Sequence, residues 1–533
     1  MKMVKSLVLG SAAALLAMGG AQAADLPVKA KAVEYVRVCS LYGAGFWYIP
    51  GTDTCIKIGG YLRVDGTFNG SGVYDDPAWS GNAGLGTRFS DYTQVRSRMA
   101  LTVDTRTATE YGVVRTFAQG DFQFNDFGNS APATTSPAAS LSGLSSSLLD
   151  GVGGGYVAVE YVFIQFAGFT FGKSSSAYAT PWNGYPGNNS SFLIGGEDSV
   201  TGVNNIQYTA QFGNGVSASI GLDDPTVFNR TPLLNLAAGG TAPGLAGAVS
   251  AAGVGTNAYG GWYMPDVVAN VRVDQAWGLF QLSGELHEVN ASYNVLTTAG
   301  APLAGTTALN DSVLSGHPDS KYGGSVMAAL QIKNIPTGPG DDIKFDATWA
   351  KGDTKNTVST SATSPTFLMM GGVPGQLGPN GSVGFGATSD GVYLPTAFGG
   401  DGQIHLTTSY GVRGAFNHNW DPYWSTSLFG GMAWVRYDST AQSEFCAAYG
   451  VTVAGQGTTY TCNPNYSISM LGAVTRWTPV KNLTFSAETI WTHLNQGFTG
   501  SATFSPGAPE PTSTYAYKNQ DTISLNVRVQ RNF

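Results

Sequence analysis

The chain has 533 residues, only 12% of them charged, and acidic residues outnumber basic ones by 35 to 27. This balance argues against nucleic acid as a partner, because phosphate binding needs clustered lysine and arginine side chains. Glycine is abundant at 72 residues and aromatic residues make up 12%, whereas a typical soluble protein is about a quarter charged. The composition suits a membrane β-barrel, and a large soluble β-sandwich or β-helix fits it equally well.

The first 23 residues have the features of a signal peptide. Lys2 and Lys5 precede a small, apolar run from Ser6 to Gly20, and Ala21-Gln22-Ala23 fits the cleavage rule for secretory signals. We therefore expect residues 1–23 to be removed and the mature, exported chain to start at Ala24. No run of 18 or more apolar residues follows, so the sequence predicts no transmembrane helix.

Alternation with a period of two residues, which is typical of strands with one apolar and one polar face, recurs through the rest of the chain. The first clear case is 56–68, whose polar face carries Lys57, Tyr61, Arg63, Asp65 and Thr67. In the second case, 93–104, the polar face carries Gln94, Arg96, Arg98, Thr102 and Asp104. A soluble sandwich would alternate in the same way, so the connections between strands have to decide.

Sixteen candidate strands are joined by connections that alternate between short and long. The long ones are rich in Gly, Ser, Pro and Thr, and a compact soluble domain rarely tolerates even one such loop. Bacterial outer-membrane barrels combine short periplasmic turns, long external loops and an even strand count. We therefore predict a transmembrane antiparallel β-barrel over 55–533, preceded by a periplasmic-side segment at 24–54. The expected strands are 55–68, 91–104, 109–120, 155–167, 168–175, 202–212, 215–224, 259–275, 278–293, 321–334, 341–354, 403–418, 422–438, 465–478, 481–496 and 515–533.

The predicted sheet has to close on itself. An open edge in lipid would leave backbone N–H and C=O groups unpaired, so the first strand should pair with the sixteenth. A barrel of this size is too wide for side chains to fill, which leaves an aqueous channel. The last strand alternates up to Phe533, with Arg531 as a departure on the lipid-facing side, where it can snorkel into headgroups at the rim.

The four cysteines fall into two closely spaced pairs, Cys39 with Cys55 and Cys446 with Cys462. Export to an oxidising compartment favours disulfides, and a loop of this size would contribute about 3 kcal/mol in the chain-entropy model. A metal site is disfavoured, since no C-x-x-C motif is present and no histidine stands close to either pair.

Two motifs carry a family resemblance. CSLYGAGFWYIPGTDTCIKIGGYLR (39–63) closely resembles the opening of the alphaproteobacterial porins of the rhizobial and brucella type, and EYVFIQFAGFTFGK (160–173) resembles their fifth hairpin. The resemblance runs from the signal peptide to Phe533. It implies sixteen strands, a homotrimer, a third loop folded into the lumen, and a bridge between Cys39 and Cys55. A bridge between Cys446 and Cys462 depends on their spacing alone.

The resemblance maps the constriction loop onto 176–201, where Glu197 and Asp198 are adjacent acids. Without the family mapping, two solvated loop acids would be the favoured interpretation. Arg63, Arg96, Arg98 and Arg115 lie on three consecutive strands, and facing lipid at mid-bilayer would cost each about 2–4 kcal/mol. We expect these arginines to share one wall of the lumen at similar depth and to face the two acids, although the alternation around Arg115 is ambiguous.

The resulting function is a general diffusion porin of the Gram-negative outer membrane, surrounded by lipid and passing small hydrophilic solutes and ions. A substrate-specific channel is the first alternative, but no run of aromatic residues is visible on the polar faces. An outer-membrane enzyme is less favoured, because the histidines are scattered and no G-x-S-x-G elbow has the required context. We expect no cofactor and no metal.

Overall fold

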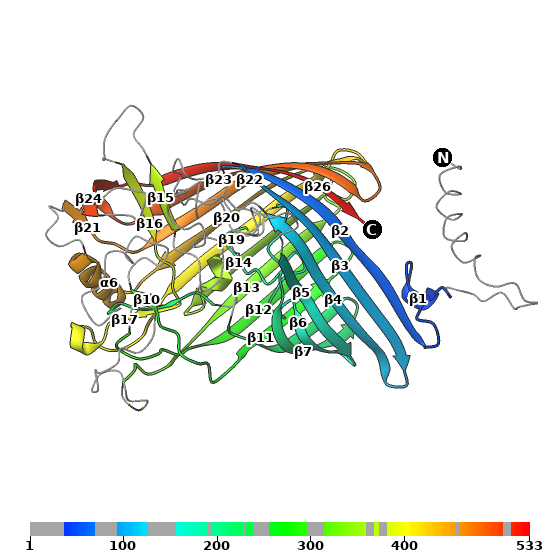
Figure 1. The fold of residues 1–533 in the computed structure, drawn as a ribbon, viewed down its shortest axis with the longest axis horizontal. Helices are drawn as coiled ribbons and strands as arrows, with labels where there is room; N and C mark the ends of the chain where they lie inside the picture. Colours follow the sequence, from blue (N-terminus) through cyan, green and yellow to red (C-terminus); the bar gives the residue numbers. More distant parts are fainter. Residues whose placement is uncertain are drawn as a thin grey trace, which may run out of the picture.

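The computed structural model shows a long barrel with short turns at one end and folded loops at the other (Figure 1). The predicted signal peptide lies outside the residues that the structure describes. Those residues are 37–69, 93–125, 156–189, 193–226, 230–237, 255–296, 314, 316–358, 367–371, 381–452, 459–504 and 513–533.

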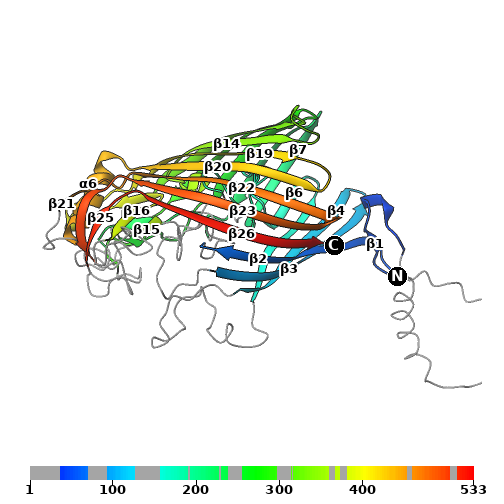
Figure 2. The ribbon, with the colours of Figure 1, turned by 90° about the horizontal axis from the view of Figure 1, so that it is seen from above.

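Sixteen antiparallel strands make the wall, each paired with its neighbours in chain order. The last strand returns to the first: β26 pairs with β2 from Tyr61 against Asn532 to Phe68 against Leu525, and the two lie side by side in Figure 2. The barrel is therefore closed and has no free edge. Its strands are β2 (Thr54–Phe68), β3 (Thr93–Thr109), β4 (Gly112–Asn125), β5 (Tyr156–Phe166), β6 (Phe169–Ser174), β7 (Val203–Gly213), β8 (Val216–Asp223), β11 (Asp266–Asp274), β12 (Gly278–Val289), β13 (Lys321–Lys333), β14 (Asp342–Lys351), β19 (Thr408–Asn419), β20 (Trp424–Arg436), β22 (Tyr466–Val480), β23 (Leu483–Gln496) and β26 (Gln520–Asn532).

Alternation places apolar side chains outside and polar ones inside. On β2, Leu62 and Val64 are about half exposed on the outer surface, whereas Asp65 and Thr67 are buried on the lumen side. The sixteen predicted strands are all present, with ends shifted by up to seven residues, the largest shift being at the start of β11, which begins at Asp266 and not at 259. Arg531 donates a hydrogen bond to the backbone carbonyl of Lys481 at the turn end of the barrel.

The short turns use residues that tolerate a left-handed backbone. Asn214 (φ 48°) and Gly215 (φ 73°) join β7 to β8, and Ala167 (φ 49°) and Gly168 (φ 86°) join β5 to β6, as expected for tight hairpins. Exposed aromatic side chains gather at this end of the barrel, in line with the interfacial aromatic girdles of membrane barrels. They include Tyr111, Phe212, Trp277, Trp420 and Tyr423.

The N-terminal segment packs at the turn end of the barrel. It contains a 3₁₀ turn, η1 (Ser40–Tyr42), and a short strand, β1 (Trp47–Tyr48), which pairs with β2. The predicted disulfide between Cys39 and Cys55 is present and buried with Phe46. The segment is therefore attached to the first wall strand both covalently and by backbone pairing.

The external end carries structure that the sequence does not reveal. Leu193, Phe367, Phe385, Phe445 and Tyr515, from several loops, belong to one buried cluster of apolar side chains. The second disulfide, between Cys446 and Cys462, joins α6 to β21 and its flanking loop. Among the described residues no helix is long and apolar enough to cross a membrane. The elements at this end are β9 (Leu233–Asn235), β10 (Thr256–Asn257), β15 (Phe367–Gly371), β16 (Ser382–Gly386), β17 (Gly391–Tyr393), β18 (His405–Leu406), β21 (Thr459–Thr461), β24 (Thr499–Phe504), β25 (Ser513–Tyr517), α5 (Lys355–Val358), η3 (Thr396–Phe398) and α6 (Ser439–Thr452).

Candidate pore constriction

The third external loop, 175–202, connects β6 to β7 and folds into the barrel, as the family resemblance implies. Its first part runs along the inner faces of β11 and β12. Ser283 Oγ donates a hydrogen bond to the carbonyl of Tyr178 (2.8 Å), and Gln281 Nε2 donates to the carbonyl of Ala179 (2.9 Å). Polar side chains of the wall thus donate hydrogen bonds to backbone carbonyls of the loop, which would otherwise need water as a donor.

The loop continues along the wall as far as β23. Asn417 on β19 donates to the carbonyl of Pro186 (3.0 Å), and Arg476 on β22 donates to the carbonyl of Gly187 (2.6 Å). Asn189 then donates to Ser486 Oγ on β23 (2.7 Å). The loop therefore covers one continuous side of the lumen, from β11 to β23.

A buried ion pair holds the returning part of the loop. Arg413 on β19 contacts Asp346 on β14 (Nε to Oδ1, 2.9 Å), and neither side chain is accessible to solvent. Arg413 also donates to the carbonyl of Glu197 (2.6 Å), and Trp182 Nε1 donates to Asp346 Oδ2 (2.9 Å). The ion pair thus holds the loop at two places: Asp346 binds Trp182 in its first part, and Arg413 binds Glu197 in its returning part.

None of these contacts of the loop involves β26, β2, β3 or β4. On these strands the lumen side of the wall carries a row of charged side chains. Arg528 and Arg96 both pair with Asp65, at 2.5 Å and 3.1 Å. Arg98 pairs with Asp121 at 2.8 Å and contacts Glu160 at 3.5 Å. We call these residues, with Arg63, the charge ladder. Each guanidinium in it lies beside a carboxylate or an amide oxygen, which offsets the cost of removing it from bulk water.

Three of the four predicted arginines meet in this ladder. Arg63 lies directly opposite Arg98, and Arg96 lies opposite Asp65. Arg115 is not among them. In the register between β3 and β4, Arg115 lies opposite Arg106, whereas Arg98 lies opposite Gln123. Arg115 is therefore roughly 26 Å further along the strand, at about 3.3 Å per residue. It forms an ion pair with Asp104 (3.0 Å) near the short turn. The prediction that Arg115 lies at the same depth as the other three arginines is therefore wrong.

The two predicted acids occupy different environments in the loop. Glu197 is fully buried, and neither of its carboxylate oxygens has a hydrogen-bond partner in the described part of the chain. Asp198 is partly exposed and accepts a hydrogen bond from the backbone N–H of Val200 (2.9 Å). Burial, with the neighbouring charge of Glu197 adding to it, raises the pKa of Asp198 to about 7.

Sequence reasoning missed four members of the ladder. It places Asp65 on a polar face but gives it no arginine partner, and it does not single out Asp121, Glu160 or Arg528. All four side chains are buried on the lumen side of their strands. The signal was present, since Arg528 lies on the polar side of the last strand and Asp65 on that of the first. Their contact follows from the register between those strands, which no local pattern specifies.

Comparison with known proteins fits this geometry. The model of the porin subfamily matches residues 25–526. The Omp2b porins of Brucella canis and Brucella abortus are each 36% identical to the chain over 282 residues. These alignments cover 52% of the chain and 63% of the Omp2b porins, so the chain spans less than two thirds of the length of these relatives.

A solved structure shares the architecture at low identity. The outer membrane channel DcaP of Acinetobacter baumannii superposes with a TM-score of 0.53 at 13% identity, covering 91% of this chain and 99% of DcaP. At that identity the likeness concerns the fold alone. With the family match over nearly the whole chain and the closed sixteen-stranded wall, it gives one conclusion: the chain belongs to the porin subfamily, and its barrel spans the outer membrane of a Gram-negative bacterium.

Proposed function

We propose that the chain forms a water-filled channel through which small hydrophilic solutes and ions diffuse passively. The single observation that carries the proposal is a closed barrel whose inner face is lined by charged and polar side chains, with one loop folded against one side of the lumen. Sixteen strands enclose more space than wall side chains alone can fill. Family membership indicates a channel rather than an enzyme.

Planar-bilayer recording tests the channel directly. Purified protein added to one side should produce stepwise conductance that increases in proportion to salt concentration. Small sugars should enter without saturable block in a general porin. If one solute blocks the current at low concentration, the chain is a substrate-specific channel instead. Protein that inserts into the bilayer but carries no current would contradict both forms of the proposal.

The constriction lies, in our proposal, between the third loop and the charge ladder. Arg63, Arg96 and Arg98 would supply the basic side, and Asp198, with Glu197 behind it, the acidic side. A charge about 10 Å from a passing ion is worth about 0.4 kcal/mol in bulk water and about four times more at an effective dielectric of 20. Such a field would orient dipolar solutes and give a modest ion preference.

Reversal potentials in a salt gradient test this arrangement. Glu197→Gln with Asp198→Asn should shift selectivity towards anions, because the arginines then dominate. Arg96→Gln with Arg98→Gln should shift it towards cations, because Asp65, Asp121 and Glu160 lose their partners. Permeability ratios should change by roughly two- to twentyfold.

Arg115→Gln is the matched control, since Arg115 faces the same lumen near the turn end, away from the ladder. It should move the reversal potential less than the ladder variant does. Unchanged potentials in both double variants, with the pores still conducting, would place the constriction elsewhere.

A homotrimer is part of the proposal and depends on the family resemblance. Unheated protein should migrate in a denaturing gel at several times the mass of the chain, and boiling should convert it to a single band at the mass of one chain. Monomeric migration across several mild detergents would contradict the trimer without affecting the channel proposal.

A further inference from the structure

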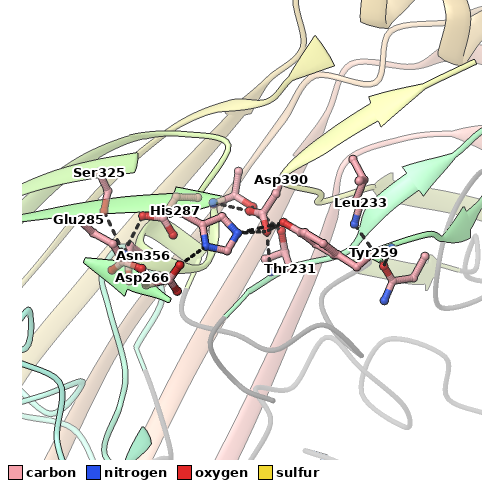
Figure 3. A network of polar contacts seen from close by, with 12 residues as sticks. Thr231, Leu233, Tyr259, Asp266, Glu285, His287, Ser325, Asn356 and Asp390 are labelled. Carbon is pink, nitrogen blue, oxygen red and sulfur yellow. Dashed lines mark hydrogen bonds and ion pairs between the residues drawn. The ribbon is translucent and has the colours of Figure 1, made fainter. Parts of the chain in front are cut away.

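Figure 3 shows a cluster of ionisable side chains around β11 and β12. It lies at the external ends of these two strands, whereas the charge ladder is on β26, β2, β3, β4 and β5. Asp266 on β11 and Glu285 and His287 on β12 bring their potential ligand atoms within 4.8 Å of one another. Asp266 and His287 are fully buried, and Glu285 is partly exposed. The proposed channel function uses none of these residues.

The hydrogen bonds of His287 indicate which ring nitrogen carries a proton. The Tyr259 hydroxyl donates to Asp390 Oδ2 (2.8 Å) and contacts His287 Nε2 (3.0 Å). Asp390 also accepts bonds from the backbone N–H groups of Thr231 (3.1 Å) and Thr354 (2.7 Å), which fits a carboxylate. Since the hydroxyl has a single proton, its oxygen must accept one from Nε2.

This assignment leaves His287 Nδ1 directed at a carboxylate. Nδ1 lies 2.6 Å from Asp266 Oδ1. In the neutral ring with the proton on Nε2, both atoms carry lone pairs and would repel each other. The contact is favourable only if a proton lies between the two atoms, on the ring or on the carboxyl group of Asp266, or if a cation lies beside both atoms.

Among the residues that the structure describes, none donates a hydrogen bond to two buried carboxylate oxygens in this cluster. They are Glu285 Oε1 and Asp353 Oδ1, and Asp353 is 1% exposed. The other oxygen of each carboxylate accepts from the same atom, Asn356 Nδ2, at 2.6 Å and 2.9 Å. The two carboxylates therefore lie side by side, each with a free oxygen, and an orphaned buried carboxylate oxygen is costly.

The charges of the region also favour a bound cation. Asp223 on β8 lies directly opposite Asp266 on β11, and both are buried; like charges in that position are destabilising. Lys355 is buried, and Arg230 stacks on the ring of Tyr259 at 3.9 Å. Five carboxylates, of Asp223, Asp266, Glu285, Asp353 and Asp390, therefore outnumber these two basic groups.

We propose that Asp266, Glu285, His287 and Asp353 bind one divalent transition-metal ion of the Zn²⁺ type. One imidazole nitrogen with three carboxylate oxygens is a donor set that suits Zn²⁺, whereas Ca²⁺ takes oxygen ligands only. Tyr259 and Asp390 supply the outer hydrogen bond that a metal-bound histidine normally makes through its other ring nitrogen. Ligands about 2.0 Å from a tetrahedral ion are about 3.3 Å apart. The ligand atoms of Asp266, Glu285 and His287 already lie within 4.8 Å of one another, and Asp353, which shares the donor Asn356 with Glu285, would turn towards them as the fourth ligand.

The ion would connect the wall to the third loop. Asp353 precedes α5, and the carbonyl of Thr357 in α5 accepts a hydrogen bond from the backbone N–H of Gly195 in the returning part of the loop (3.0 Å). Metal binding would therefore fix α5 against β11 and β12 and stabilise the loop through it.

Zinc binding to the full-length protein in detergent tests the proposal. A second group, Asp401, His405 and Glu444, also gathers potential ligands at the external end, so the measurement uses His405→Gln as its background. After treatment with EDTA and dialysis, this protein should bind one Zn²⁺ per chain by calorimetry and elemental analysis. Adding Glu285→Gln or His287→Gln should weaken binding at least tenfold.

X-ray absorption of the zinc-loaded His405→Gln protein tests the site even if a further variant fails to fold, because it needs no second substitution. The spectrum should show one nitrogen-type imidazole ligand among oxygen ligands. The proposal is overturned if the background protein binds no Zn²⁺, which would leave a proton between His287 and Asp266 as the explanation. It is also overturned if zinc is retained with Glu285→Gln and His287→Gln, or if the protein takes Ca²⁺ and not Zn²⁺.

Discussion

Asp198 is the partly exposed acid of the third loop and, in our proposal, the one that faces the lumen. Its carboxylate is partly exposed, whereas that of its neighbour Glu197 is enclosed by the loop and the wall. Burial raises the pKa of Asp198, Glu197 raises it further, and Arg413 and Lys355 oppose the rise, leaving a value of about 7. A group that titrates there changes the charge of the lumen within an ordinary experimental pH range.

Ion selectivity should therefore depend on pH. Below pH 7 Asp198 is mostly protonated and neutral; above pH 7 it is charged and attracts cations. Raising the pH from 5 to 9 should shift the reversal potential towards cations, with a midpoint near 7. Asp198→Asn should reduce this step. A step that persists unchanged in that variant would assign it to another group.

For single residues, the sequence predicts whether a side chain faces the lumen or the lipid, but not which charged residue it contacts. Alternation places Arg96 and Arg98 in the lumen correctly, because a charged side chain at mid-bilayer is costly on the lipid side. It says nothing of Asp121 or Glu160 as their partners, since a pair across strands depends on register. The predicted depth of Arg115 is wrong for a different reason: β4 runs from Gly112 to Asn125, so Arg115 lies close to the short turn and not in the middle of the strand.

The third loop is the element on which the proposed constriction depends. Gly196 passes directly over the buried pair of Arg413 and Asp346. A Cβ built on Gly196 would lie 2.5 Å from both Arg413 Nε and Asp346 Oδ1. The backbone can approach the pair this closely only because the position has no side chain.

Gly196→Ala should therefore displace the loop or the ion pair, at a cost of about 1–3 kcal/mol for overpacking. We expect noisier single-channel currents and faster proteolysis of the loop, with the wall intact. Gly66→Ala on β2 is the control, because a Cβ there meets no atom within 4 Å. Equal current noise in the two variants would contradict the role of Gly196.

Elements differ in how far the sequence predicts them. The wall strands are long, and period-two alternation over eight or more residues identifies them. Strands such as β9 and β17 have three residues each, which is too short for any periodicity to be visible. The external core of Phe385, Phe445 and Tyr515 combines residues from separate loops, so it exists only once the barrel has brought those loops together.

The molecule as a whole combines two kinds of stabilisation. Backbone hydrogen bonds around a closed sheet hold the wall, and lipid makes their loss expensive because no water replaces them. The external end instead has a core of apolar side chains, like that of a soluble domain, and the disulfide between Cys446 and Cys462 lies beside it. The two parts should therefore respond differently to the loss of a covalent bond.

Removing the external disulfide should loosen that end alone. Phe445 and Tyr449 of α6 are buried in the external core, and the chain-entropy model assigns a bridge enclosing this short segment about 3 kcal/mol. In Cys446→Ala with Cys462→Ala, amide hydrogens of α6 and the loops around it should exchange faster. Those of the wall strands should keep their protection, and the gel shift on boiling should be unchanged.

Cys39→Ala with Cys55→Ala is the matched comparison, since that bridge encloses a segment of the same length at the opposite end of the barrel. It should speed exchange in the N-terminal segment and leave α6 unaffected. Loss of wall protection in the external variant would mean that barrel and external core unfold as one unit. Unchanged exchange in α6 would show instead that the apolar core alone holds the helix in place.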